Sequence, residues 1–154
     1  MAGLVAGCGD LFFGDDDPPF DVPDEVIASI APGFIPEDTA YVEVPDTVRV
    51  GEPFSVSVRT FFVCQLSPGR TEIKTTQRSR VEITPFMDFE LQRNCPDVLH
   101  VTARTVSVRF NHVGQNSVVV YGTNHIRYPP YRGHVALPVD TLEVVRTVTA
   151  VLDR

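Results

Sequence analysis

Hydrophobic and polar residues alternate along the chain from residue 41 onward. The clearest run is 54–64, where the apolar residues at even positions share one face: Phe54, Val56, Val58, Phe62 and Cys64. A period of two places successive side chains on opposite sides of a β-strand. We therefore predict a half-buried strand here, with Cys64 in the core or at its edge.

Alternating runs and turn residues recur over the rest of the chain, which predicts an all-β domain. The predicted strands are 41–44, 47–50, 54–64, 80–84, 99–110, 117–122, 135–139 and 142–152. In 99–110 the alternation slips near Arg104, so we predict a β-bulge at that residue. About seven short strands favour an immunoglobulin-like β-sandwich, with a small β-barrel as the alternative.

The first 40 residues lack this alternation. Residues 9–40 contain the acidic run Asp15, Asp16, Asp17 and five prolines, which is typical of a disordered tether. We therefore divide the chain into a truncated lipoprotein leader and acidic Pro-rich tether at 1–40 and one folded domain at 41–154. A short apolar cluster at 26–30 has two interpretations, an extra strand on the domain or a helical turn.

The composition supports one folded domain and narrows the classes of partner. With 154 residues, 43% of them hydrophobic, the chain can build one well-buried core but hardly two.

The net charge is −7, and residues 1–52 hold twelve acidic residues against the one base Arg49. The remaining bases form no cluster, so we expect no nucleic-acid partner, because phosphate binding needs clustered Lys or Arg. No apolar stretch in the sequence reaches the length of a membrane-spanning helix.

The N-terminal residues Val5-Ala6-Gly7-Cys8 resemble the lipobox of bacterial lipoproteins. In that family the cysteine becomes the lipidated first residue. The resemblance therefore implies lipidation of Cys8, a location in a bacterial cell envelope, and membrane contact through that lipid alone. Only seven residues precede Cys8, whereas a signal peptide has about 15–30. We expect the full gene to encode a longer apolar leader.

Under the lipoprotein interpretation, Cys64 and Cys95 remain as an even pair. A disulfide between them is the natural assignment in an oxidising compartment, where it would stabilise the domain by roughly 3–4 kcal/mol in the chain-entropy model. Two free thiols in a cytosolic protein and a metal pair are the alternatives. No Cys-x-x-Cys spacing supports the metal.

A set of short motifs lies within residues 41–122. They are Pro45-Asp46-Thr47-Val48, Gly51-Glu52-Pro53-Phe54, Thr60, Cys64, Val81-Glu82-Ile83-Thr84-Pro85-Phe86, Cys95 with Asp97-Val98-Leu99, and Phe110 with Gly114. Together they resemble the uncharacterised immunoglobulin-like lipoproteins of environmental bacteria. The resemblance implies the fold, export and the Cys64–Cys95 cystine, and it brings no catalytic residues.

Candidate catalytic chemistry is sparse. The sequence contains no Gly-x-Ser-x-Gly, His-Glu-x-x-His or phosphate-binding glycine loop. Glu82, Asp88 and Glu90 could imitate the carboxylate pair of a glycoside hydrolase, but we interpret them as solubilising charges. We therefore expect neither an enzyme nor a cofactor.

Four histidines are the only candidates for a soft metal site: His100, His112, His125 and His134, with Met87 or Asn124 as further ligands. Their spacing matches no metal-binding pattern with a physical basis. A periplasmic metal-handling protein that uses His112, His125 and His134 is nevertheless the alternative function.

The connection 123–134 is long for a sandwich and rich in Tyr, Arg and Pro. Arg127, Tyr128, Tyr131 and Arg132 belong to the residue types that dominate binding hot spots. In the other interpretation the two tyrosines only cap an open end of the sandwich. We expect a non-enzymatic, envelope-anchored interaction module whose unknown partner is a protein or a glycan.

Overall fold

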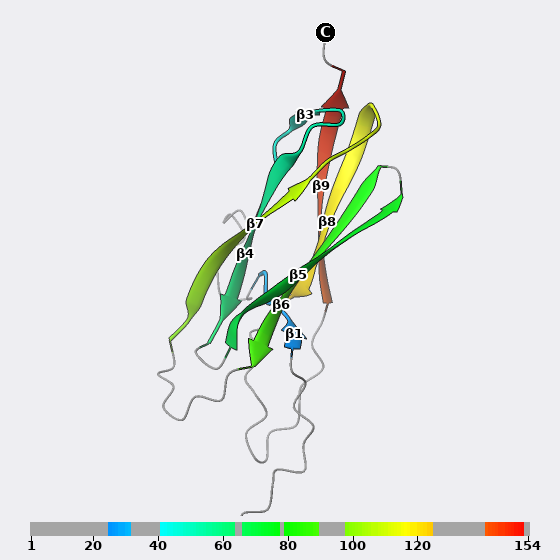
Figure 1. Ribbon diagram of the computed structural model, residues 1–154. Coiled ribbons are helices and arrows are strands. Elements are labelled where there is room, and N and C mark those ends of the chain that lie inside the picture. The colour runs from blue at the N-terminus through cyan, green and yellow to red at the C-terminus, as the bar shows by residue number, and fades with distance from the viewer. Residues whose placement is uncertain are drawn as a thin grey trace, which may run out of the picture.

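The computed structural model describes residues 25–31, 41–63, 66–77, 79–89, 98–124 and 141–152 (Figure 1). Their strands are β1 (Glu25–Ile27), β2 (Val42–Glu43), β3 (Thr47–Arg49), β4 (Phe54–Phe62), β5 (Leu66–Gln77), β6 (Arg80–Phe89), β7 (His100–Val108), β8 (Gly114–Thr123) and β9 (Thr141–Val151). The prediction of an all-β fold is confirmed for this part of the chain. It includes no helix able to cross a membrane.

The strands form two sheets. The larger has the order β1-β6-β8-β9-β3, with β5 also paired to β6, and the smaller has the order β2-β4-β7. Most neighbours are antiparallel, but β6 pairs with β8 and β3 pairs with β9 in parallel. The chain therefore crosses between the sheets after each of β1, β2, β3 and β4, and again after β6 and after β7.

The strand directions give the molecule two distinct ends. At one end, here called the loop end, β4, β6 and β8 finish and β5, β7 and β9 begin, as Figure 1 shows at the bottom of the view. At the other, the turn end, β5, β7 and β9 finish and β6 and β8 begin, as Figure 1 shows toward the top of the view. The chain enters β1 at the loop end and leaves β9 at the turn end.

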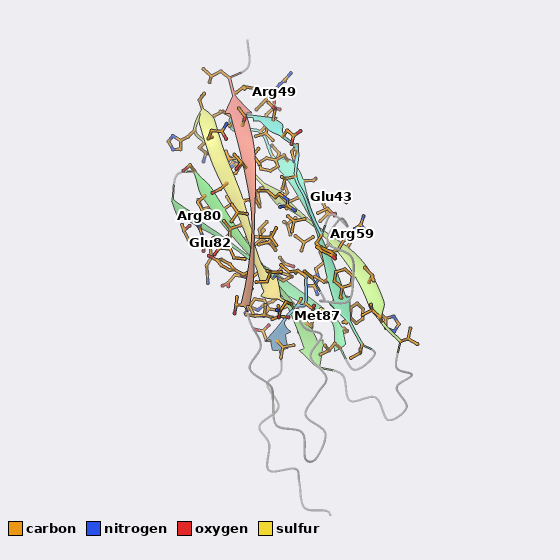
Figure 2. All side chains as sticks on the ribbon, turned by 180° about the vertical axis from the view of Figure 1, so that it is seen from behind. Glu43, Arg49, Arg59, Arg80, Glu82 and Met87 are labelled. Atoms are coloured by element: carbon orange, nitrogen blue, oxygen red, sulfur yellow. The ribbon has the colours of Figure 1, made fainter. Side chains whose placement is uncertain are left out.

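Apolar residues from both sheets meet in one core. Val56, Val58 and Val108 of the smaller sheet and Ile83, Val118 and Val148 of the larger sheet belong to the same buried cluster. A second cluster at the loop end contains Val26, Ala28, Phe62, Leu66 and Met87. Figure 2 shows these side chains filling the space between the sheets, with Met87 toward the loop end. Alternation in the sequence thus corresponds to burial, because each strand turns its apolar face to the opposite sheet.

Segment 25–31 belongs to this core, although it lies within the predicted tether. Of the two interpretations, the strand is correct: β1 pairs antiparallel with β6, Val26 lying opposite Met87. Beyond β1 the segment joins both sheets, because Ser29 forms bridges to Phe61 of β4 and Thr123 of β8. The rest of the tether prediction concerns residues outside the described ranges.

Two details of the sequence prediction need correction. No strand was predicted at β5, whose residues include Pro68 and Gly69 and alternate weakly. Proline is tolerated there because β5 is an edge strand. The predicted bulge at Arg104 is wrong, since β7 pairs with β4 residue by residue from His100 to Val108. The predicted strand 135–139 lies outside the described residues.

Candidate functional site

The predicted binding connection 123–134 leaves the sheet at the loop end. Thr123, the last residue of β8, pairs with Thr141, the first residue of β9. Arg127, Tyr128, Tyr131 and Arg132 lie outside the described residues. The pairing nevertheless shows that the intervening residues begin and end at adjacent positions of the sheet. A connection between such neighbours needs only about 2–5 residues, so this one is far longer than the sheet requires.

The cysteines 8, 64 and 95 also lie outside the described ranges, but the strands that flank the predicted disulfide are neighbours. Phe62, near the end of β4, pairs with His100 at the start of β7. Their rings are stacked, with centroids 5.3 Å apart. Cys64 and Cys95 are therefore attached to adjacent strand ends at the loop end.

Segment 25–31 braces the loop end through backbone hydrogen bonds. Ala28 N–H donates to the Pro85 carbonyl of β6 at 2.9 Å, and Phe61 N–H of β4 donates to the Ser29 carbonyl at 2.9 Å. Ile30 N–H donates to the Thr123 carbonyl at 3.0 Å, and Thr123 N–H donates to the Ala28 carbonyl at 3.0 Å. At the entry to β1, hydrogen bonds from Arg70 lower the pKa of Glu25. Segment 25–31 is thus hydrogen-bonded to the ends of β4, β6 and β8.

The two described histidines, His100 and His112, lie at opposite ends of the molecule. His112 lies at the turn end, where its carbonyl accepts a hydrogen bond from Asn116 Nδ2, whereas His125 directly follows Asn124 at the loop end. The ten residues of β8 separate these ends by about 30 Å. A single site within one chain therefore cannot easily combine His112 with His125. Among the described residues, no three His, Cys, Asp or Glu side chains are grouped to hold a metal ion.

The two described carboxylate candidates, Glu82 and Asp88, do not form a catalytic pair. Glu82 and Asp88 stand six residues apart on β6, which corresponds to about 20 Å, while glycoside hydrolases need roughly 5–9.5 Å. Glu90 lies outside the described residues. Glu82 instead accepts a hydrogen bond from Arg80 Nε at 2.9 Å on the outer side of the larger sheet (Figure 2). Arg80 also donates to Tyr121, and this hydrogen bond raises the pKa of Arg80.

Arg104 occupies a regular position of β7, opposite Val58 of β4, and not a bulge. It points inward from β7 and donates to the Gly69 carbonyl of β5 at 3.0 Å and to the Phe86 carbonyl of β6 at 2.7 Å. The irregular strand is β5. A register shift between Pro68 and Thr71 leaves Gly69 and Arg70 without partners in the pairing with β6. Arg104 binds the carbonyl groups of both residues. Burial lowers the pKa of Arg104, and the nearby Asp88 carboxylate opposes this effect.

A second arginine, which is exposed, joins the sheets on the other side. Arg146 of β9 donates from Nε to the Val42 carbonyl of β2 at 3.2 Å. Among the described residues, Arg104 therefore joins the two sheets on one side and Arg146 joins them on the other. An arginine is suited to this position because its long apolar stem packs along the core while its fork reaches several acceptors.

Replacing Arg104 by alanine is expected to lower the free energy of unfolding by about 2–4 kcal/mol, because it leaves partly buried carbonyl groups without donors. Arg59 provides the matched control, since it also lies on the smaller sheet but forms an exposed ion pair with Glu43. Arg59→Ala should change stability by no more than about 1 kcal/mol. Urea denaturation of both variants measures the difference. Equal effects would show that Arg104 does not tie the sheets.

A shallow hollow of about 400 Å³ lies at the turn end, away from the predicted binding connection. Its walls are mainly apolar and include Pro45, Val48, Pro53, Phe54 and Val151. Arg49 and Glu52 form an ion pair at 3.6 Å beside it. Among the described residues, the hollow holds no grouped nucleophile, base or metal ligand.

Comparison with known proteins gives no relative: no protein-family model, no curated protein and no solved structure matches the chain. The resemblance to immunoglobulin-like lipoproteins therefore stays a prediction.

Proposed function

We propose that the protein is a non-enzymatic interaction module of a bacterial cell envelope, and that residues 123–134 bind its partner, a protein or a glycan. The observation that carries this proposal is the pairing of Thr123 with Thr141, which pins both ends of an unusually long connection to adjacent strands. Ordering such a connection costs conformational entropy, and a bound partner offsets that cost. Its Tyr and Arg residues suit a binding surface.

The proposed architecture is an immunoglobulin-like sandwich. The packing of a three-stranded sheet on a larger one, with repeated crossings between them, supports this assignment. The parallel pairing of β6 with β8 departs from it, because immunoglobulin sheets are antiparallel. The hairpin of β5 and β6 thus places its second strand, β6, beside β8.

Envelope anchoring through a lipid on Cys8 agrees with the direction in which the chain enters the domain. Since β1 begins at the loop end, a tether before Glu25 would turn this end toward the membrane. Residues 123–134 would then face partners close to the membrane surface. When the gene is expressed with its leader, labelled fatty acid should be incorporated at Cys8; equal labelling of Cys8→Ser would refute the anchor.

The proposed Cys64–Cys95 disulfide is supported by the neighbouring positions of Phe62 and His100. Mass spectrometry of the unreduced exported protein should find a peptide that links the two cysteines. Reduction should lower the free energy of unfolding by roughly 3–4 kcal/mol, given the length of the closed loop. Free thiols in protein taken from an oxidising compartment would contradict the proposal.

The triple change Tyr128→Ala, Tyr131→Ala, Arg132→Ala tests the binding role directly. If these side chains bind a partner, stability should change by no more than about 0.5 kcal/mol, while a crosslinking pull-down from the native envelope should lose its specific product. A matched control replaces exposed Gln115 at the turn end by alanine and should keep that product. Loss of several kcal/mol with capture intact would show that the tyrosines cap the core instead.

A further inference from the structure

The edges of the two sheets are protected to very different degrees. β5 carries a proline, two register shifts and the charged residues Arg70, Glu72 and Lys74. β2 and β3 are only two and three residues long, and the edge of β9 carries Glu143 and Arg146. Charges, prolines, irregularities and short length are the usual devices that keep edges from pairing with other chains.

β7 has none of these devices on its outward-facing positions. It runs for nine residues without a register shift. The side chains that it turns to the outer face are uncharged and mostly small: Val101, Ala103, Thr105 and Ser107. Val101 is 54% exposed. Within the described ranges, β7 is therefore the one long, regular edge whose outward-facing positions carry no charge, and its inward-pointing Arg104 is bound to carbonyl groups of β5 and β6.

The hydrogen bonds of β4 show which groups this edge offers. Arg59 N–H donates to Tyr41 and Phe61 N–H donates to Ser29, so the odd-numbered residues of β4 bond away from β7. The even-numbered residues therefore bond to β7, and their partners are its even-numbered residues. The N–H and C=O groups of Val101, Ala103, Thr105 and Ser107 point to the free edge. They have no backbone partner in the described part of the chain.

The larger sheet extends beyond β7. Arg104 of β7 reaches both β6 and β5, and β5 is the last strand of the larger sheet on this side (Figure 1). Ile73 of β5 pairs with the fully buried Ile83 and so shares its inward face, yet Ile73 is 43% exposed. A strand added about 4.8 Å outside β7 would lie over this part of β5. The smaller sheet is thus one strand short of covering the larger one.

This geometry accommodates a single strand better than a second copy of the domain. If β7 paired with β7 of another copy about a twofold axis, each larger sheet would bring its own β5 under the shared pair. The two β5 strands would then compete for the same space. An isolated extended segment avoids this overlap.

We propose that the free edge of β7 accepts one extended segment of a partner protein as an added strand. The inference rests on the proposed interaction function and deepens it, because it makes the partner a polypeptide and the contact a backbone ladder. The segment has alternating side chains, with uncharged apolar residues turned toward Ile73 and Val106. Its outward residues continue the Ser- and Thr-rich outer face of β7.

The probe is a synthetic peptide with the sequence of β4, Phe54–Phe62, because β7 already pairs with this pattern on its other edge. Binding should slow hydrogen exchange of the Val101, Ala103 and Thr105 amides by about tenfold or more. It should also shift the methyl signals of Ile73. A peptide of the same composition without alternation serves as control. Absence of protection at millimolar peptide would overturn the inference.

Ala103→Pro removes one donor at the free edge while sparing the pairing with β4, so it should abolish peptide binding in a folded protein. Ala103→Val keeps that donor and should bind like the natural sequence. Thr105→Pro repeats the test at the next edge amide in case the first variant does not fold. Equal peptide binding by the natural sequence and a folded proline variant would contradict a backbone ladder.

Two further outcomes separate this inference from the proposed function. Protection of the same amides in the protein alone, together with a doubled mass in sedimentation, would assign the edge to a second copy and overturn the proposal. If Ala103→Pro keeps the envelope partner that the 123–134 variant loses, the interaction function stands and the strand-acceptor inference fails.

Discussion

Removing residues 1–31 is expected to unfold the domain, whereas removing residues 1–24 should change its stability little. The longer deletion removes Val26, Ala28 and Ile30 from the core, where each is at most 5% exposed. It also leaves the N–H groups of Phe61 and Thr123 without their acceptors. Loss of a buried isoleucine alone costs about 2–5 kcal/mol, and the total should approach the whole stability of a small domain.

Circular dichroism and urea denaturation of the two shortened proteins measure this effect. Ile30→Ala in the full-length chain provides a graded control and should lower the free energy of unfolding by about 2–5 kcal/mol. Cooperative unfolding of the protein without residues 1–31, at a midpoint near that of the full chain, would show that the domain begins after this segment. In that case the predicted boundary at residue 40 would be the correct one.

Gly122→Val is expected to destabilise the domain, because Gly122 of β8 lies directly against Ile30. A Cβ atom at this position would lie no more than 2.7 Å from three carbons of the Ile30 side chain. Ile30 is fully buried and cannot turn away without disturbing the core. Overpacking of this kind costs about 1–3 kcal/mol or more.

A double-mutant cycle with Ile30→Ala identifies the cause. If the clash dominates, the substitution at Gly122 should cost less in the Ile30→Ala background, with a coupling of about 0.5–3 kcal/mol. Thermal unfolding of the four proteins gives the required values. Additive effects would mean that the glycine is needed for another reason, and the contact between the two segments would lose its energetic role.

The sequence determined the all-β class and the position of most strands. In β4, the alternation of Phe54, Val56 and Val58 with serines is a local property, because successive side chains of any strand point to opposite faces. The same reasoning located β7, β8 and β9. The binding connection and the cysteines were identified by residue type, and their roles stay predictions.

Only the tertiary structure decided how the strands pair and what the irregular residues do. The acceptors of Arg104 lie 18–35 residues away along the chain, so its break in the alternation looked like a bulge in its own strand. Segment 25–31 is too short to show a pattern and is defined by contacts with β4, β6 and β8. The open edge of β7 likewise depends on which strands lie beside it, and pairing between distant segments is not a local property of the chain.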